Sequence, residues 1–315
     1  MRRAIVHAGM AGAIWGAVIV IPSLIPDVHP VVISCARFLL YGLFAAALAL
    51  PRARQLLARL NRRDVLLLLE LALTGNVVYF ILLSAAVQFA GVAIASLING
   101  LIPVAIMLMG RRSSDGQSGS MLISMAFICA GIAWINLPAI MQIVNGQGNG
   151  DKAFGALLAL LGVLSWSWFA LRNARQMKTL RFSPSEWSTL QGMVTGAVAL
   201  FITLAVCIFQ PQLLPTGLSG ERLSVFALTI LFLAIGGSWM ANGLWNSAAQ
   251  RLPIAISGQM IVFETLCALL YSYIIARALP SANEAVGILL VLGGVAWTLD
   301  AQARRAAQVR RQLAG

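Results

Sequence analysis

The sequence predicts an all-α integral membrane protein in which ten transmembrane helices form two inverted five-helix repeats. Three observations predict this fold: ten apolar stretches, a one-sided distribution of positive charge, and short motifs that recur in both halves. Each stretch has roughly 17 to 27 residues, which is long enough for a helix to cross a bilayer. Hydrophobic residues make up 60% of the 315 and charged residues only 10%, whereas about a quarter of a soluble domain is charged.

The expected spans are joined by short loops, and no segment is long enough for a separate soluble domain. We interpret the apolar run within Met1–Pro26 as the first span and not as a cleavable signal, because it is longer than the apolar core of a signal peptide. The ten spans are Ile5–Leu24, Val31–Leu50, Val65–Ala86, Val92–Met109, Met121–Ile140, Phe154–Leu171, Glu186–Phe209, Leu223–Ala249, Pro253–Ile275 and Asn283–Leu299.

The distribution of the 22 lysines and arginines predicts the orientation. With the amino terminus in the cytoplasm, only Lys152, Arg222 and Arg277 fall outside, and Arg37 lies within a span. Positive residues near span ends resist translocation, so this bias places both termini in the cytoplasm. The net charge of +12 is then explained by topology and by contact with anionic lipid headgroups. We therefore expect a lipid bilayer and no nucleic acid among the partners.

No pattern typical of catalysis or of a bound cofactor is found. The four cysteines lie in four different spans without CxxC spacing, and His7 and His29 sit at span ends. Disulfides and metal sites are therefore not expected. Buried Ser/His pairs and paired aspartates are also missing from the sequence, so we expect no enzyme activity and no cofactor.

Short motifs recur in the same order in both halves, which predicts an internal repeat. The polar stretch Gln142–Asp151 reads as the linker, giving halves 1–145 and 146–315. Five spans in each half give the second half the opposite orientation, and inverted repeats are typical of secondary transporters that alternate between two access states. The paired segments are Leu71–Gly75 with Leu233–Gly237, Ser84–Gln88 with Asn246–Gln250, Gly131–Trp134 with Gly294–Trp297, and Pro30 and Gly42 with Pro184 and Gly196.

Four segments carry a resemblance to a known family: Trp15-Gly16, Arg37–Leu40, Ala95–Pro103 and Phe263-Glu264. They resemble the ten-span, EamA-type members of the drug/metabolite transporter superfamily, and within it an aromatic amino-acid exporter of Gram-negative inner membranes. The resemblance implies export of small molecules through a central cavity of a bacterial inner-membrane protein. The chain departs from the family at Thr265, where a proline is usual, and it has no lysine in span one.

Polar residues inside a span cost free energy unless they face the bundle interior or a water-filled cavity. A spacing of four keeps such residues on one helix face. We expect this face to line a central pathway, and interhelical hydrogen bonding is the alternative. Deeply placed tryptophans would hold a flat apolar side chain, with simple packing as the alternative. The cavity candidates are Asn76, Tyr79, Phe80 and Ser84 in span three, Ser238, Asn242 and Asn246 in span eight, Asn99 and Gln259 in spans four and nine, and Trp15, Trp166 and Trp239.

Glu264 is the one acid near the middle of an expected span, and Arg37 is the one lysine or arginine inside a span. A carboxylate at Glu264 is expected to be neutral or paired, so it is either a proton-coupling group or a structural one. Arg37 either snorkels outward or meets a carboxylate of the substrate or of the protein. Its repeat partner is Gln191, so the pair is asymmetric.

These residues favour a zwitterionic substrate. Both lysines lie in loops, which disfavours sugar phosphates and nucleotide sugars, whose phosphates need buried basic groups. Amino acids, chiefly aromatic or neutral ones, fit the expected cavity best. Lipophilic cations are the alternative, because aromatic faces also attract cations, and a membrane scaffold or receptor is the alternative outside transport. All these features are compatible with a monomer.

Overall fold

The computed structural model describes residues 2–109, 119–135, 137, 141, 150–215, 217–252 and 260–314, and every regular element in these ranges is helical. Six described helical stretches are long and apolar enough to cross a membrane: Arg3–Val20, Pro30–Ala58, Arg62–Gly91, Gly150–Met177, Pro184–Phe209 and Gly220–Arg251. Three shorter described helices are also apolar: Leu122–Trp134, Val262–Ala276 and Ala282–Gly294. The prediction of an all-helical membrane protein is confirmed.

The helices follow the expected spans with some changes at their ends. The linker Gln142–Asp151 lies mostly outside the described residues, as does the start of the expected ninth span. The elements are α1 (Arg2–Val20), α2 (Pro30–Ala49), α3 (Ala53–Ala58), α4 (Arg62–Leu71), η3 (Ala72–Val77), α5 (Val78–Asn99), α6 (Ile102–Met109), α7 (Gly119–Ile135), α9 (Gly150–Met177), α10 (Pro184–Phe209), α11 (Gly220–Leu231), η5 (Phe232–Met240), α12 (Ala241–Arg251), α14 (Val262–Ala276) and α15 (Ala282–Ala314), with short 3₁₀ turns at η1 (Ile21–Leu24), η2 (Leu50–Arg52) and η4 (Pro211–Leu213).

The helix starts follow from local sequence. Pro30 and Pro184 open α2 and α10, where proline fixes the backbone angle that a helix needs and loses no hydrogen bond. Ser183 and Glu186 form a capping box at α10, in which each side chain accepts a hydrogen bond from the other residue's backbone N–H. Asn61 and Asp64 form the same box at α4.

The expected fourth span, Val92–Met109, is not one helix. Gly91 adopts a φ of +84° at its start, a region that favours glycine. The helix ends at Asn99, and α6 begins only at Ile102. The break places Asn99 at a helix end, where its side chain and the local backbone face the bundle interior. Hydropathy alone does not detect such a break, because the flanking residues are all apolar.

Two helices contain π-helical segments, η3 and η5, at positions that the sequence pairs as repeats. A π turn inserts extra residues into a helix and changes which residues share a face, and it is frequent at functional sites. Gly75 lies in η3 and Gly237 in η5. A Cβ at Gly75 would lie 2.1 Å from the ring of Phe169, and one at Gly237 would lie 2.5 Å from Val18 Cγ2. Both π segments therefore allow unusually close packing at the centre of the molecule.

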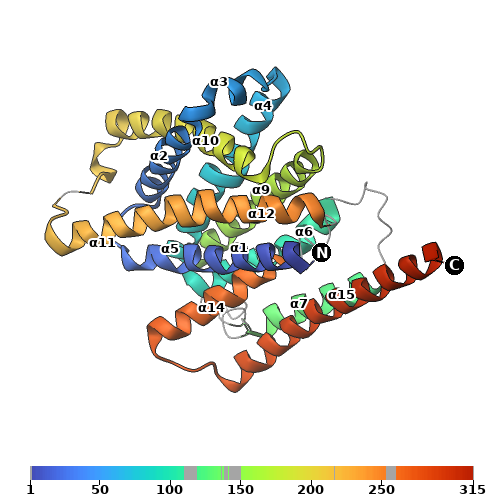
Figure 1. Ribbon diagram of the computed structural model, residues 1–315. Helices are drawn as coiled ribbons and strands as arrows, with labels where there is room; N and C mark the ends of the chain where they lie inside the picture. The colour runs from blue at the N-terminus through green and yellow to red at the C-terminus, as the bar shows by residue number, and fades with distance from the viewer. Residues whose placement is uncertain are drawn as a thin grey trace.

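Several helix contacts are reciprocal between the two halves. A Cβ on either Gly42 or Gly196 would lie 2.5 Å from the Cα of the other, so α2 and α10 cross in direct backbone contact. Helices α7 and α15 lie side by side at one edge, and the end of α15 projects beyond the other helices (Figure 1). Gly131 of α7 approaches the carbonyl of Gly287, and Gly294 of α15 approaches the carbonyl of Ser124. Small residues permit such close contacts in membranes.

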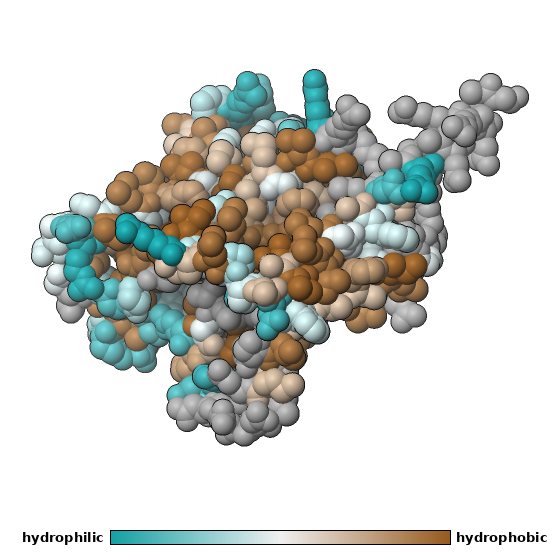
Figure 2. All heavy atoms as spheres, turned by 90° about the horizontal axis from the view of Figure 1, so that it is seen from below, coloured by the Kyte–Doolittle hydropathy of each residue, from teal (hydrophilic) through white to brown (hydrophobic). Residues whose placement is uncertain are grey.

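The surface carries many large apolar side chains. The face in Figure 2 is dominated by hydrophobic residues, with hydrophilic ones gathered mainly toward its edges. Leu43, Phe201 and Leu289 are 69%, 73% and 67% exposed. A soluble monomer rarely exposes an apolar surface of this extent, so these side chains are in place to face lipid.

Candidate functional site

A small central cavity of about 30 Å³ lies between the two halves of the chain. Elements from both halves line it: α1, α2, η3 and α5 from the first, and α9, η5, α12 and α14 from the second. This volume is far below the roughly 300–1,000 Å³ typical of small-molecule pockets, so the cavity as it stands is too small for a substrate. Six of the expected cavity residues line it: Trp15, Asn76, Tyr79, Phe80, Trp166 and Asn242.

Arg37 reaches this cavity from α2 and is only 5% exposed. Its Nε donates a hydrogen bond of 2.9 Å to Ser238 Oγ. The Ser238 hydroxyl in turn donates to the carbonyl of Leu233, 3.0 Å away and five residues earlier, a partner that the π turn brings within reach. The guanidinium carbon lies 4.3 Å from the centre of the Phe80 ring. Arg37 therefore points inward and does not snorkel to the surface.

Glu264 reaches the same cavity from α14 and is 4% exposed. Its Oε1 accepts a hydrogen bond of 3.2 Å from Asn99 Nδ2. The hydroxyl of Tyr79 donates to Asn99 Oδ1 at 3.1 Å. This chain fixes the amide so that its NH₂ faces the carboxylate. Asn99 thus contributes through its side chain at the end of α5, next to the helix break.

Three tryptophans pack together on one side of the cavity. The ring centres of Trp15 and Trp166 are 5.8 Å apart and nearly perpendicular, and Trp245 lies 5.5 Å from Trp15 and 5.9 Å from Trp166. Trp15 Nε1 also donates to the carbonyl of Gly237 at 2.9 Å. Trp245 was not among the expected cavity residues, but it is 2% exposed. Sequence reasoning missed it because its burial depends on where α12 packs.

A larger cavity of about 530 Å³ adjoins the central one on the other side. Both cavities share Val18, Ile19, Phe80 and Leu83, so these four side chains form the partition between them. The remaining lining lies further along α5 and after α1, and includes Ser84 together with Pro22, Pro26 and Gln88. Ser84 was an expected cavity residue, whereas Pro22 and Pro26 were not, because an apolar residue in an apolar span carries no sequence signal.

A buried hydrogen-bond network lies one turn beyond the tryptophans. Asn173 Oδ1 accepts from Trp187 Nε1 and from Gln191 Nε2, each at 2.8 Å, and Asn173 Nδ2 donates to Asn246 Oδ1 at 2.7 Å. Asn173 is fully buried. It was missed because the sixth span was expected to end at Leu171, whereas α9 continues to Met177.

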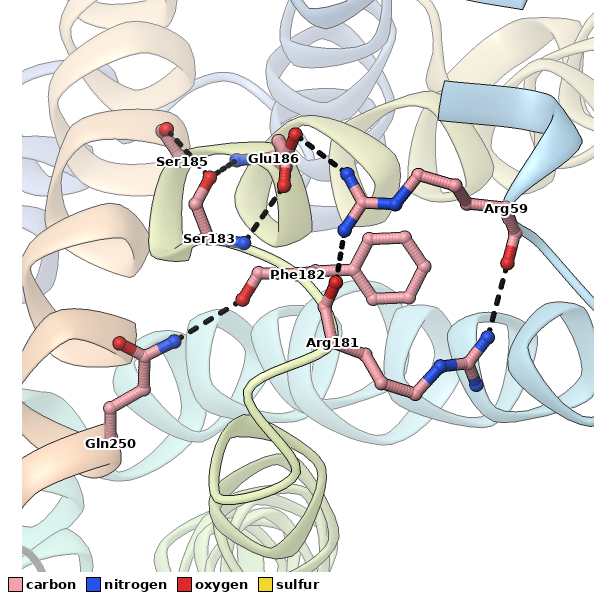
Figure 3. Close-up of polar contacts among 7 residues, drawn as sticks. All are labelled: Arg59, Arg181, Phe182, Ser183, Ser185, Glu186 and Gln250. Atoms are coloured by element: carbon pink, nitrogen blue, oxygen red, sulfur yellow. Dashed lines mark hydrogen bonds and ion pairs between the residues drawn. The ribbon is translucent and has the colours of Figure 1, made fainter. Parts of the chain in front are cut away.

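Beyond the tryptophans and the Asn173 network, a third layer lies at the same end of the molecule. The arginine-rich connections from α3 to α4 and from α9 to α10 meet there, and we call this end the basic side. Figure 3 shows the Phe182 ring between the guanidinium groups of Arg59 and Arg181. Each arginine also donates to the backbone carbonyl of the other. Arg59 pairs with Glu186 at 3.0 Å, and Gln250 Nε2 of α12 donates to the Phe182 carbonyl at 3.2 Å.

Residues on successive turns of α12 therefore belong to successive layers between the cavity and the basic side. Asn242 lines the cavity, Asn246 belongs to the Asn173 network, and Gln250 holds the outer loop. The tryptophans, the amide network and the arginine loops are three closed layers on the basic side. The large cavity lies on the opposite side.

Some expected site residues are not in the central cavity. Trp239 is placed elsewhere: it packs on Phe44 of α2 with ring centres 5.5 Å apart and donates to Thr189 Oγ1. The π turn explains this, because it directs Ser238 toward Arg37 and its neighbour toward α10. Asn246 lies in the amide network and Ser84 in the large cavity. Gln259 lies outside the described residues.

The family model described as the EamA-like transporter family matches this chain over two segments, residues 2–137 and 153–299. The chain belongs to the EamA-like transporter family. In this EamA-like chain, one matched segment falls within residues 1–145 and the other within residues 146–315.

Relatives of this EamA-like protein have transporter or membrane-protein names. The inner membrane protein YtfF of Escherichia coli is 34% identical over 307 residues, covering 94% of each chain. The uncharacterized transporter YetK of Bacillus subtilis is 23% identical over 297 residues, covering 93% of this chain and 85% of that one. A solved crystal structure of a protein matches with a TM-score of 0.71 at 20% identity, covering 96% of this chain and 98% of that chain, which shows a shared fold.

Proposed function

We propose that this EamA-like protein is a secondary transporter that exports amino acids, chiefly aromatic and neutral ones, across a bacterial inner membrane by alternating access. The central cavity carries the proposal. It lies between the two halves, contains one cation, one acid and an aromatic wall, and is separated from the basic side by three closed layers. The large cavity on the opposite side adjoins it through a partition of four apolar side chains.

Residues 1–145 and 146–315 are proposed to be inverted repeats with both chain ends in the cytoplasm. Three observations support this: the two-segment family match, the paired π segments, and the reciprocal glycine contacts. Two similar halves of opposite orientation exchange conformations at little cost in free energy, so opening one side is coupled to closing the other. In this orientation the basic side is cytoplasmic, and the structure corresponds to a state closed toward the cytoplasm. All cavity-lining elements come from one chain, so a monomer is the proposed transport unit.

The substrate class is supported by the chemistry of the lining. Amide, hydroxyl and aromatic groups surround the cavity, and its single described basic residue is Arg37, which is too few for a phosphate group. The narrower resemblance of the sequence to the aromatic amino-acid exporter YddG points to the same class. The similarity to the inner membrane protein YtfF of Escherichia coli supports an inner-membrane location.

The test is flux of labelled phenylalanine in proteoliposomes that contain the purified protein, against protein-free liposomes. We expect protein-dependent flux that unlabelled tyrosine and tryptophan inhibit. Methylviologen serves as the probe of the cation alternative. Absence of amino-acid flux, with protein-dependent uptake of methylviologen, would replace the amino-acid proposal by the cation one. Absence of flux for every probe would favour a scaffold or receptor.

A further inference from the structure

We propose that Arg37 and Glu264 bind the two charged ends of a zwitterionic α-amino acid, with the carboxylate on Arg37 and the ammonium group on Glu264. The inference rests on the proposed amino-acid transport and deepens it, since it assigns the residues that recognise the substrate and the orientation in which it binds.

Arg37 offers a donor edge that no described residue occupies. Only its Nε has a hydrogen-bond partner among the described residues, the Ser238 hydroxyl, and none of their carboxylates forms an ion pair with it. The side chain is nevertheless 5% exposed. The guanidinium carbon lies 4.3 Å from the centre of the Phe80 ring and 5.0 Å from that of Phe38, and the residue lines the cavity. A carboxylate would fit this edge with two parallel hydrogen bonds.

Gly237 lies against the guanidinium of Arg37. A Cβ at this position would lie 3.5 Å from Arg37 Nη2, in van der Waals contact, and only 2.5 Å from Val18 Cγ2, so a side chain here would displace Val18 from the wall of the cavity. The glycine belongs to η5, the same π segment whose Ser238 orients Arg37. One distortion of the helix therefore both aims the arginine and allows close packing beside it.

Glu264 is the complementary half of the site. Its Oε1 accepts from Asn99, and no described residue donates to its Oε2. The Tyr79–Asn99 hydrogen bond fixes the amide, so the carboxylate is held in one orientation and one oxygen stays available for a donor. An ammonium group supplies three such donors.

Arg37 and Glu264 share one cavity but form no ion pair within 4.0 Å of each other. A purely cationic ligand would satisfy Glu264 and leave Arg37 buried without a carboxylate, and a purely anionic ligand would do the reverse. Leaving a buried charge unpaired is strongly unfavourable. A zwitterion is the ligand that compensates both, which favours an amino acid over a lipophilic cation.

The position of the substrate side chain follows from the partition. The central cavity, at about 30 Å³, has no room for it. The shared residues Val18, Ile19, Phe80 and Leu83 separate this cavity from the apolar space of about 530 Å³. With its charged ends fixed, the amino acid would displace Phe80 or Leu83 and extend its side chain into the larger cavity.

The experiment compares phenylalanine with three analogues that lack one charge, in competition with labelled phenylalanine for binding to the purified full-length protein. Phenylalanine amide and phenethylamine lack the carboxylate, and 3-phenylpropionate lacks the amine. We expect each analogue to compete at least ~100-fold more weakly than phenylalanine, because a site built for a polar group rejects ligands without it. Equal competition by phenethylamine and phenylalanine would overturn the role of Arg37.

Two variants that each remove one charge separate loss of recognition from loss of folding. Arg37→Gln should weaken phenylalanine binding strongly and phenethylamine binding little, so that the preference between them collapses. Glu264→Gln should do the same for the preference over 3-phenylpropionate and leave the preference over phenethylamine in place. Equal weakening of all ligands in both variants would contradict the assignment. If wild-type protein transports phenylalanine without discriminating the analogues, the inference fails and the proposed function stands; if it neither binds nor transports any amino acid, the proposed function itself fails.

Discussion

Replacement of Asn173 should open the basic side of the molecule. Its side chain makes three buried hydrogen bonds, to Trp187, Gln191 and Asn246, which tie α9 to α10 and α12. Asn173→Leu keeps the number and branching of the side-chain heavy atoms and removes all three hydrogen bonds. Side-chain hydrogen bonds within membrane proteins contribute about 0.6 kcal/mol each on average, so the closed state should lose about 2 kcal/mol. That loss raises the open fraction roughly 30-fold.

The assay is labelling of a cysteine at Ala170, a buried position three residues before Asn173 on the same face of α9. The four native cysteines are first replaced by alanine, and an impermeant maleimide is applied to inside-out vesicles. Labelling follows the open fraction, so Asn173→Leu should accelerate it roughly 30-fold. Gln191→Met, which removes one bond, is the matched control and should give about a threefold increase. If Asn173→Leu labels no faster than Gln191→Met, the network does not hold this side closed.

Two further predictions concern the loops and the cavity. Arg181→Met should lower the melting temperature of the purified protein more than Arg59→Met. Asp64, which pairs with Arg181, is 4% exposed, whereas Glu186, which pairs with Arg59, is 27% exposed, and an exposed pair contributes only about 0–1 kcal/mol. Equal melting temperatures of the two variants would contradict this. Gly237→Ala should weaken amino-acid binding, because the new Cβ would lie 2.5 Å from Val18 Cγ2. Adding Val18→Ala should relieve this clash and restore binding. A double variant that binds as weakly as Gly237→Ala would argue against the clash.

Much of the fold and part of the site follow from the sequence alone. Apolar stretches predict helices because a spanning segment must satisfy its backbone hydrogen bonds internally. Asn76, Tyr79 and Asn242 were predicted to face the interior because a polar side chain in an apolar run needs a partner away from lipid. The structure places all three on the central cavity. For a polar side chain in an apolar run, the local sequence is therefore enough to indicate that it faces the interior of the bundle.

Other features depend on tertiary contacts that no local pattern encodes. The π segments leave the hydropathy of their helices unchanged, so the packing of Trp239 against Phe44 and Thr189, away from the cavity, was not predictable from the sequence. Asn173 looked like a loop residue because Arg172 and Arg175 follow the apolar run. Helix α9 continues through both arginines, and Arg172 pairs with Glu70 of α4 at 2.9 Å. Both side chains of this pair are partly exposed, so the helix continues without burying an unpaired charge.

The proposed ligand charges also explain where the two halves differ. A pair of similar halves provides two access states of similar free energy, but an amino acid has a carboxylate at one end and an ammonium group at the other. Its site must therefore break the symmetry of the scaffold. The repeat partner of Arg37 is Gln191, and alignment of Pro103 with Thr265 places Ile102 opposite Glu264. Gln191 closes the basic side through the Asn173 network, and Ile102 is fully buried in the apolar core. In the proposed transporter each half thus contributes one charge of opposite sign, so a zwitterion would bind in one orientation while the halves exchange states.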